Sequence, residues 1–177
     1  MKIIKKILCF MLAATLLLGC LISCGEEELE NGEYHVFGLH YTLGEGYNKI
    51  NVPYSENCYT NGEAYFFFQV FSGEGLEEIG VDDDITVDLY MQKFLVWNYQ
   101  NPFIYDYDKD RDLAYAHYLS SDMLVPEDAG ESEAEYFYTA VLRGTNHLYV
   151  VNMSCNPELL EKYRSHFEDI IASLRAD

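Results

Sequence analysis

The sequence has 177 residues, with 11 Lys and Arg against 30 Asp and Glu, a formal net charge of −19 and 49% apolar residues. This length suits one domain of ordinary size, and the apolar fraction is too high for a disordered chain. Binding to nucleic acid phosphates requires clustered Lys and Arg, so the composition excludes nucleic acid as a partner. It also excludes membrane attachment through a basic surface.

The N-terminal residues have the pattern of a bacterial export signal. Three lysines precede an uncharged run over residues 7–24, as in signal peptides with a positive start and an apolar centre. At the end of this run, Leu21-Ile22-Ser23-Cys24 resembles the lipobox of bacterial lipoproteins, whose cysteine is acylated and becomes the new N-terminus. Leu17-Leu18-Gly19-Cys20 fits the lipobox less well. We therefore predict a lipoprotein signal peptide over residues 1–23.

Cleavage before Cys24 predicts how the mature chain is attached to the membrane. Two acyl chains on Cys24 give stable membrane anchoring, and residues 24–33, which include five glutamates, form an acidic tether. Loss of three lysines lowers the net charge from −19 to about −22. The single globular domain, residues 34–177, is then expected at the cell membrane, outside the cytoplasm. The alternative is an uncleaved signal anchor, because the 18-residue uncharged run (7–24) is near the short limit of a membrane span.

The mature chain contains several segments with the pattern of strands. Residues Ala64–Phe71 read AYFFFQVF, a nearly continuous apolar run that predicts a strand covered on both faces. Arg143-Gly144-Thr145-Asn146 has hairpin residues, because Gly and Asn accept positive φ. One continuous strand over residues 34–43 would send His35 and His40 to opposite faces. The predicted strands are residues 34–43, 64–71, 103–107, 113–119, 135–142 and 147–153.

Two amphipathic helices are predicted far apart in the sequence. The first covers residues 86–99, with Thr86 or Asp84 as its cap and Asn101-Pro102 as its stop. The second begins at Asn156, a good N-cap followed by Pro157, and its apolar stripe consists of Leu160, Tyr163, Phe167, Ile170, Ile171 and Leu174. A sheet apolar on both faces and two such helices predict an α+β fold, a three-layer α/β/α sandwich with a central, mostly antiparallel sheet.

Three segments together resemble a known family. Phe37–Leu43 (FGLHYTL), Met91–Leu95 (MQKFL) and Phe167–Leu174 (FEDIIASL) look like segments of the PsbP-like α/β/α sandwich domains found in many bacterial lipoproteins. The resemblance covers about residues 34–175 and departs from the family at Gly44-Glu45-Gly46, where such domains often have proline and glycine. It implies a binding or assembly module, mostly without catalysis, and it brings no functional residue to particular positions of this chain.

Two cysteines, Cys58 and Cys155, belong to the domain once the signal is removed. In an oxidising compartment outside the cytoplasm, they can form a disulfide that closes a loop of roughly one hundred residues and adds about 4 to 5 kcal/mol. They can equally remain two buried thiols, because the sequence gives no distance between the sulfurs. Both possibilities stay open.

The segment Asp106–Asp112 contains four alternating carboxylates, which imitates the start of a calcium loop. Its sixth position is Arg111, where the turn of a calcium loop needs glycine, and its twelfth is His117, where a bidentate glutamate is needed. An acidic turn between two strands is therefore the favoured interpretation. The candidate metal ligands are Asp106, Asp108, Asp110 and Asp112.

No catalytic motif is present in the sequence. It contains no Gly-x-Ser-x-Gly elbow, no phosphate loop and no His-Glu-x-x-His helix, and we expect neither a cofactor nor enzymatic activity. We predict a membrane-anchored binding or assembly module for an envelope protein or a small ligand. The alternatives are an envelope-polymer hydrolase with paired carboxylates and a calcium-dependent surface protein. An aromatic binding face is a further hypothesis, weighed against tyrosines that simply line the sheet: Tyr107, Tyr115, Tyr136 and Tyr138.

Overall fold

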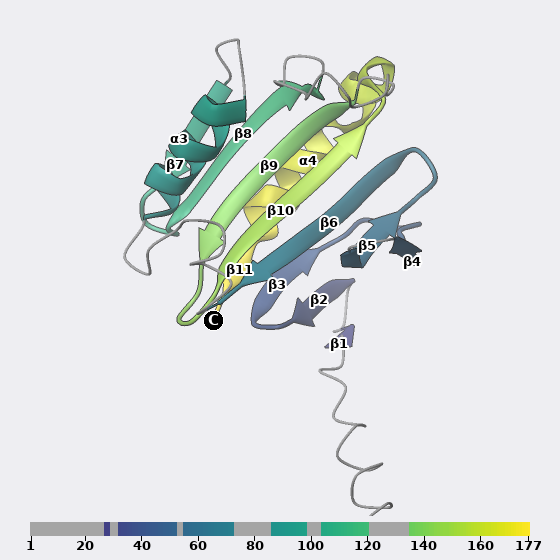
Figure 1. Ribbon diagram of the computed structural model, residues 1–177. Coiled ribbons are helices and arrows are strands. Elements are labelled where there is room, and N and C mark those ends of the chain that lie inside the picture. Colours follow the sequence, from purple (N-terminus) through teal and green to yellow (C-terminus); the bar gives the residue numbers. More distant parts are fainter. Residues whose placement is uncertain (1–26, 29–31, 53–54, 73–85, 99–103, 121–134) are drawn as a thin grey trace, which may run out of the picture.

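Seven strands form the main sheet of the domain, and all neighbouring strands in it are antiparallel. Their order across the sheet is β4-β5-β6-β10-β9-β8-β7, which confirms the predicted mostly antiparallel sheet. The strands are β4 (Asn48–Val52), β5 (Ser55–Thr60), β6 (Ala64–Phe71), β7 (Ile104–Asp108), β8 (Leu113–Leu119), β9 (Tyr136–Arg143) and β10 (Leu148–Cys155). Five antiparallel pairs of consecutive strands, together with the pairing of β6 and β10, build the whole sheet (Figure 1).

The computed structural model describes residues 27–28, 32–52, 55–72, 86–98, 104–120 and 135–177. The predicted signal peptide, Cys24 and most of the predicted tether lie outside these residues, as does the predicted helix stop at Asn101-Pro102. Within the described ranges, no helix combines the length and the apolar character needed to cross a bilayer.

A second, smaller sheet has the order β1-β2-β3-β11, again with antiparallel pairs. Its strands are β1 (Glu27–Glu28), β2 (Glu33–Val36), β3 (Leu39–Thr42) and β11 (Arg175–Ala176). The prediction of one continuous strand over residues 34–43 was wrong, because Phe37 and Gly38 have φ of 53° and 82° and reverse the chain. Positive φ at both central residues defines the tight hairpin turn that suits the twist of the strands.

Two helices and a short 3₁₀ turn complete the described structure: α3 (Val87–Asn98), η2 (Pro157–Leu159) and α4 (Leu160–Ser173). The Thr86 Oγ1 accepts the backbone N–H of Leu89 at 3.1 Å, and Asn156 Oδ1 accepts that of Glu158 at 2.9 Å. Both predicted caps are therefore present and satisfy N–H groups that a helix start leaves free. The predicted stripe of the second helix is also confirmed, with Tyr163, Phe167, Ile170, Ile171 and Leu174 buried.

Helices α3 and α4 lie on opposite faces of the main sheet (Figure 1). Alternation along β9 shows this: Val141 packs with Val87 and Met91 of α3, whereas Ala140 and Leu142 belong to the core that contains α4. The hairpin β2–β3 contributes to the same core as α4, so the small sheet and α4 cover one face together. This face carries the larger of the two apolar clusters.

Strand β6 departs from its prediction in one respect. Its exposure alternates along the strand, with Phe66 and Phe68 buried and Tyr65 40% exposed. The expectation that both faces are covered was therefore wrong for the described part of the chain, where α3 lies over β8 and β9 rather than over β6. A continuous apolar run is thus compatible with a strand that has one well-buried face.

The turn between β9 and β10 also has a different basis from the one predicted. Neither Gly144 nor Asn146 has positive φ. Gly144 is instead required for space, because a Cβ there would lie 2.9 Å from the backbone oxygen of Asp177 and 3.1 Å from Cε2 of Tyr149. The glycine thus lets the β9–β10 turn pass close to the segment that follows β11.

The substitution Phe37→Asn is expected to stabilise the domain by about 0.5 to 1 kcal/mol. Phe37 is 42% exposed and has a φ that a bulky residue adopts at a cost, whereas Asn-Gly is the preferred pair for this turn. Urea denaturation measures the difference. The control is Phe37→Val, which keeps an apolar side chain but is less tolerant of positive φ. A stability of the Asn variant at or below that of the Val variant would contradict the strain argument.

Candidate functional site

Two histidines lie side by side on the hairpin β2–β3. The register of this hairpin places His35 directly opposite His40, and their rings stack with centroids 4.1 Å apart and an interplanar angle of 11°. The prediction that these two side chains point to opposite faces was wrong, because the turn at Phe37 and Gly38 makes them cross-strand partners. Residues directly opposite each other in an antiparallel pair share a face.

The carboxylate of Asp177 joins the two rings. Its Oδ2 lies 3.1 Å from His35 Nε2 and its Oδ1 lies 3.1 Å from His40 Nε2, so each oxygen meets one ring. The backbone holds this position: Asp177 N donates to the oxygen of Gly38 at 3.0 Å, and its backbone oxygen accepts from Thr145 N at 2.7 Å. Strand β11 brings Asp177 there by pairing antiparallel to β3.

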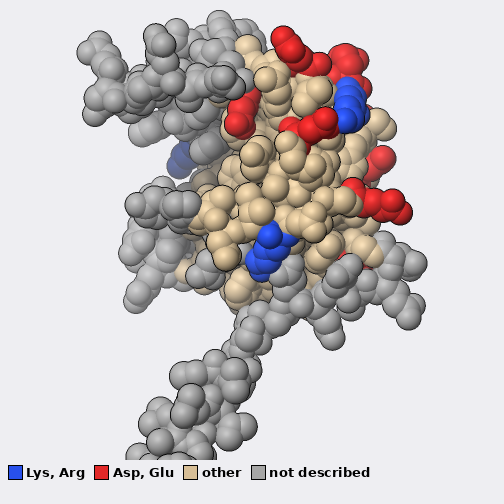
Figure 2. All heavy atoms as spheres, turned by 90° about the vertical axis from the view of Figure 1, so that its right-hand side faces the viewer, with Lys and Arg blue, Asp and Glu red and all other residues tan. Residues whose placement is uncertain are grey.

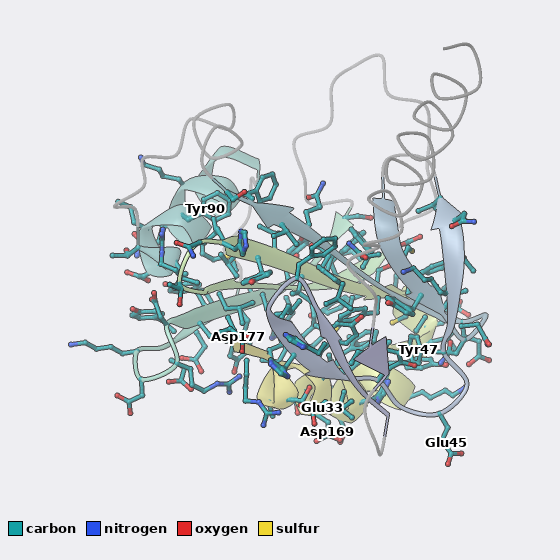
Figure 3. All side chains as sticks on the ribbon, turned by 90° about the horizontal axis from the view of Figure 1, so that it is seen from below. Glu33, Glu45, Tyr47, Tyr90, Asp169 and Asp177 are labelled. Atoms are coloured by element: carbon teal, nitrogen blue, oxygen red, sulfur yellow. The ribbon has the colours of Figure 1, made fainter. Side chains whose placement is uncertain are left out.

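A second acid, Glu33, lies beside His40. Its Oε1 is 3.4 Å from His40 Nδ1, and the same carboxylate forms an ion pair with Arg175. Nδ1 of His40 is buried and makes no hydrogen bond to the described residues. Figure 3, which shows the molecule from below, labels both acids, Glu33 and Asp177.

The site is electrostatically coupled and open to solvent. Hydrogen bonds from His40 and His35 hold the pKa of the Asp177 carboxyl below its ordinary value. The side chains of His35, His40 and Asp177 are 34%, 22% and 64% exposed. Among the described residues, these three form the group of histidine, cysteine and acidic side chains whose ligand atoms converge, within 4.8 Å of one another.

This cluster was not predicted from the sequence, although the sequence contains one indication of it. Gly38 lies in the middle of the interval between His35 and His40, and a turn centred there pairs the two histidines. The contribution of Asp177 has no sequence signal, because it depends on a two-residue strand at the far end of the chain.

The candidate calcium ligands form no metal-ligand group among the described residues. Asp108 Oδ1 accepts from the backbone N–H groups of Asp110 and Arg111, at 3.1 and 3.2 Å. Asp106 accepts from the hydroxyl of Tyr115 at 3.2 Å. These carboxylates are used in separate local contacts, as expected for the favoured interpretation of an acidic turn.

The last of these acids and the cation in the turn have other roles. Asp112 accepts from the hydroxyl of Tyr107 at 3.1 Å. Arg111 Nη2 donates to the backbone oxygens of Ile171 and Leu174, at 2.7 and 3.0 Å, which lie at the C-terminal end of α4. In the part of the chain that the structure describes, no metal-ligand group includes these aspartates. A calcium site at Asp106, Asp108, Asp110 and Asp112 is thus not supported by the structure.

The two domain cysteines are free and buried, so the disulfide considered as one possibility is not formed. Cys58 pairs with Phe67 of β6, and Cys155 pairs with Ala64 on the other side of that strand. Two strand spacings, about 10 Å, separate them, beyond the reach of a disulfide. Because 64 and 67 differ by an odd number, the thiols also point to opposite faces. Burial raises the pKa of both thiols, that of Cys155 to about 11.

We expect Cys58 and Cys155 to react with alkylating reagents only after unfolding, and without prior reduction. Both thiols are shielded and protonated at neutral pH, and thiolate is the reactive form. Peptide mapping by mass spectrometry after alkylation, in the presence and absence of urea, locates the modified cysteines. A Cys58–Cys155 peptide in unreduced protein from the native host would contradict the prediction.

The predicted aromatic binding face is not assembled. Tyr107 packs with the cluster on the α3 side of the sheet, whereas Tyr115, Tyr136 and Tyr138 belong to the core on the α4 side. Tyr138, one of the four residues of the hypothetical binding face, is 1% exposed and cannot contact a partner there. The alternative, that these tyrosines line the faces of the sheet, is the one that the structure bears out.

Two half-buried histidines outside the cluster are expected to make folding sensitive to acid. Burial lowers the pKa of both His117 and His166 below the ordinary value of 6.5. The unfolded chain then binds protons that the folded chain does not, so stability is retained above about pH 6.5 and falls as the pH drops toward the folded pKa. Urea midpoints between pH 7.5 and 5.5 measure the fall. The variant His117→Gln should show a shallower decline, and an unchanged slope would contradict this assignment.

Comparison with known proteins finds similarity among solved structures. No protein-family model matches the chain, and no curated protein sequence matches it. Among solved structures, the chain is similar to the solution structure of cyanobacterial PsbP (CyanoP) from Synechocystis sp. PCC 6803. The TM-score is 0.47 and the sequence identity is 14%, over 89% of this chain and 99% of that one. This similarity assigns no role to any residue here.

Proposed function

We propose that this chain is a lipid-anchored protein of the cell membrane that faces outside the cytoplasm and binds a ligand without transforming it. The lysines, the apolar run and Leu21-Ile22-Ser23-Cys24 support the anchor. The observation that carries the binding function is the convergence of His35, His40 and Asp177 at a solvent-accessible point of the small sheet. The ligand is an envelope protein or a small molecule that meets this site.

We further propose that the domain is a PsbP-like α/β/α sandwich. The positions of α3 and α4 on opposite faces of an antiparallel sheet support this arrangement. The proposal of a binding rather than a catalytic role is supported by the two cysteines, which are the strongest nucleophiles in the domain. Both are buried and protonated, and a nucleophilic cysteine requires an accessible thiolate.

The negative surface charge of the domain is consistent with a position away from anionic lipid headgroups. Figure 2 shows one face on which Asp and Glu side chains gather at the margin and outnumber Lys and Arg. Lipid headgroups that carry negative charge repel such a surface. The acyl chains on Cys24 then attach the domain. The tether predicted over residues 24–33 is in part built into the small sheet, because Glu27–Glu28 form β1 and Glu33 begins β2.

The anchor is tested by the substitution Cys24→Ser in the native host. Mass spectrometry of the wild-type N-terminus is expected to find a diacylated Cys24, and the variant is expected to remain an unprocessed, unlabelled precursor. A control, Cys20→Ser, should be processed normally. A wild-type chain that keeps residues 1–23, or that begins at another residue without lipid, would overturn the proposed anchor.

The non-catalytic role is tested by turnover assays of the full chain in detergent with peptidoglycan, glycan and ester substrates. No turnover above buffer is expected. Reproducible turnover that disappears in a variant with a single Asp, Glu or His replaced would overturn the binding role and favour the hydrolase alternative.

A further inference from the structure

We propose that His35, His40 and Asp177 bind one divalent late transition-metal ion, with Zn²⁺ as the representative. This inference rests on the proposed binding function and names the ligand of that site. The geometry, the types of ligand atom and the position of Glu33 each point to such an ion.

The spacing of the ligand atoms matches what a tetrahedral ion needs. Zinc lies at about 2.0 to 2.2 Å from nitrogen and oxygen ligands, so two ligands of one zinc ion are about 3.3 Å apart. The distances from Asp177 oxygens to His35 Nε2 and His40 Nε2 are both 3.1 Å. An ion can therefore replace the two hydrogen bonds once the two stacked rings tilt so that both Nε2 lone pairs point at it.

The kind of ligand atom selects the class of ion. Two imidazole nitrogens and one carboxylate oxygen suit zinc and its neighbours among the transition metals. Calcium and magnesium prefer sites made entirely of oxygen ligands. Three protein ligands at a solvent-accessible point leave a position for water or for a group of a partner molecule. The domain can therefore use the ion to contact a partner.

Glu33 offers a hydrogen-bond acceptor to His40 that is not used in the metal-free structure. While Nε2 of His40 donates its hydrogen to Asp177, its Nδ1 presents a lone pair to the Glu33 carboxylate 3.4 Å away, and Nδ1 remains buried without a hydrogen bond. Metal at Nε2 moves the ring proton to Nδ1, which can then donate to Glu33. Histidines that bind metals usually donate the other ring N–H to a carboxylate or carbonyl in this way.

The charges around the site favour a cation. The chain carries a formal net charge of −19, which raises the local concentration of cations. Arg175, on β11, is engaged with Glu33, and the Asp177 carboxylate meets the two rings. Both histidines must be neutral to act as ligands.

The test is a calorimetric titration of Zn²⁺ into the full chain, purified in detergent without a histidine tag and in excess Mg²⁺ to occupy nonspecific carboxylates. One Zn²⁺ per chain is expected. Replacing any ligand, in His35→Ala, His40→Ala or Asp177→Asn, should weaken binding at least tenfold. Glu33→Gln should weaken it about tenfold while keeping the stoichiometry, because Glu33 only positions His40.

Matched controls remove the same kinds of side chain elsewhere. His166→Gln deletes a histidine of α4, and Asp110→Asn deletes an exposed acid from the β7–β8 turn. Both should bind Zn²⁺ as the wild type does. Equal losses in these controls, or full binding in the ligand variants, would overturn the site and assign zinc binding to nonspecific carboxylates.

A second measurement uses only the wild-type chain, so it does not require that the variants fold. Nitrogen-15 NMR of histidine side chains in the wild-type chain should show the His40 proton on Nε2 without metal and on Nδ1 with Zn²⁺. An unchanged His40 tautomer at saturating Zn²⁺ would overturn the inference. That result would leave the anchor at Cys24 intact, since lipid attachment is read from the N-terminus, and it would leave the site to a ligand that hydrogen-bonds to the histidines.

Discussion

Phe167→Ala is expected to lower the free energy of unfolding by about 3 to 5 kcal/mol, the largest effect of any substitution considered for this domain. Phe167 is completely buried on α4, where its ring lies 5.4 Å from that of Tyr138 on β9 and 5.8 Å from that of Tyr163. Alanine removes the apolar contacts and leaves a cavity that neighbouring rings fill only in part. Urea denaturation, with the m-value compared between variants, measures the loss.

The control for this experiment is Leu89→Ala on α3. Leu89 is 43% exposed, so truncation there removes a large apolar side chain without opening a cavity and should cost well under 1 kcal/mol. A comparable cost for the two variants would mean that α4 does not depend on its buried stripe. It would contradict the description of the larger core as the layer between α4, the hairpin β2–β3 and the main sheet.

The elements that could be predicted are those whose own pattern decides their structure. The ranges of β6 and β8 were predicted to the residue, because long apolar runs between turn residues have few alternatives. Helix α4 was predicted from the cap at Asn156 and a stripe of period 3.6. In each case the local pattern and the tertiary packing favour the same structure.

The hairpin β2–β3 could not be predicted in the same way, because its turn breaks a local rule. Phe37 adopts positive φ although a bulky residue is rarely found there. Tertiary contacts compensate for this cost: the hydroxyl of Tyr149 donates to the backbone oxygen of Phe37 at 2.7 Å. Strands β4 and β5 were missed for a different reason, since the exposed residues of β4 give it no clear alternation.

The candidate site depends on a turn and a strand pairing that have no clear sequence pattern. His35 and His40 meet only because the chain turns at Phe37, and Asp177 reaches them only because β11 pairs with β3. The four aspartates of the β7–β8 turn had the more visible motif and form no common site. Convergence in space, and not the density of acidic residues along the chain, therefore determines which side chains can bind an ion.

Arg111→Met is expected to destabilise the domain by about 1 to 2 kcal/mol, the second large effect. The guanidinium of Arg111 donates to the backbone oxygens of Ile171 and Leu174, and charged donors contribute more than neutral ones. It also places a positive charge at the C-terminal end of α4, where the helix dipole is negative. Methionine keeps the apolar stem and removes the charge and both hydrogen bonds.

Two further variants separate the hydrogen bonds from the charge. Arg111→Lys keeps the charge but cannot reach two carbonyls with the same fixed fork, so an intermediate loss is expected. Arg164→Met removes an exposed ion pair with Glu161 on the same helix and should cost less than 0.5 kcal/mol. Equal stability of Arg111→Met and Arg164→Met would contradict the assigned role. A selective loss at Arg111 would explain why a cation occupies the position where a calcium loop needs glycine: the turn serves to hold the end of α4.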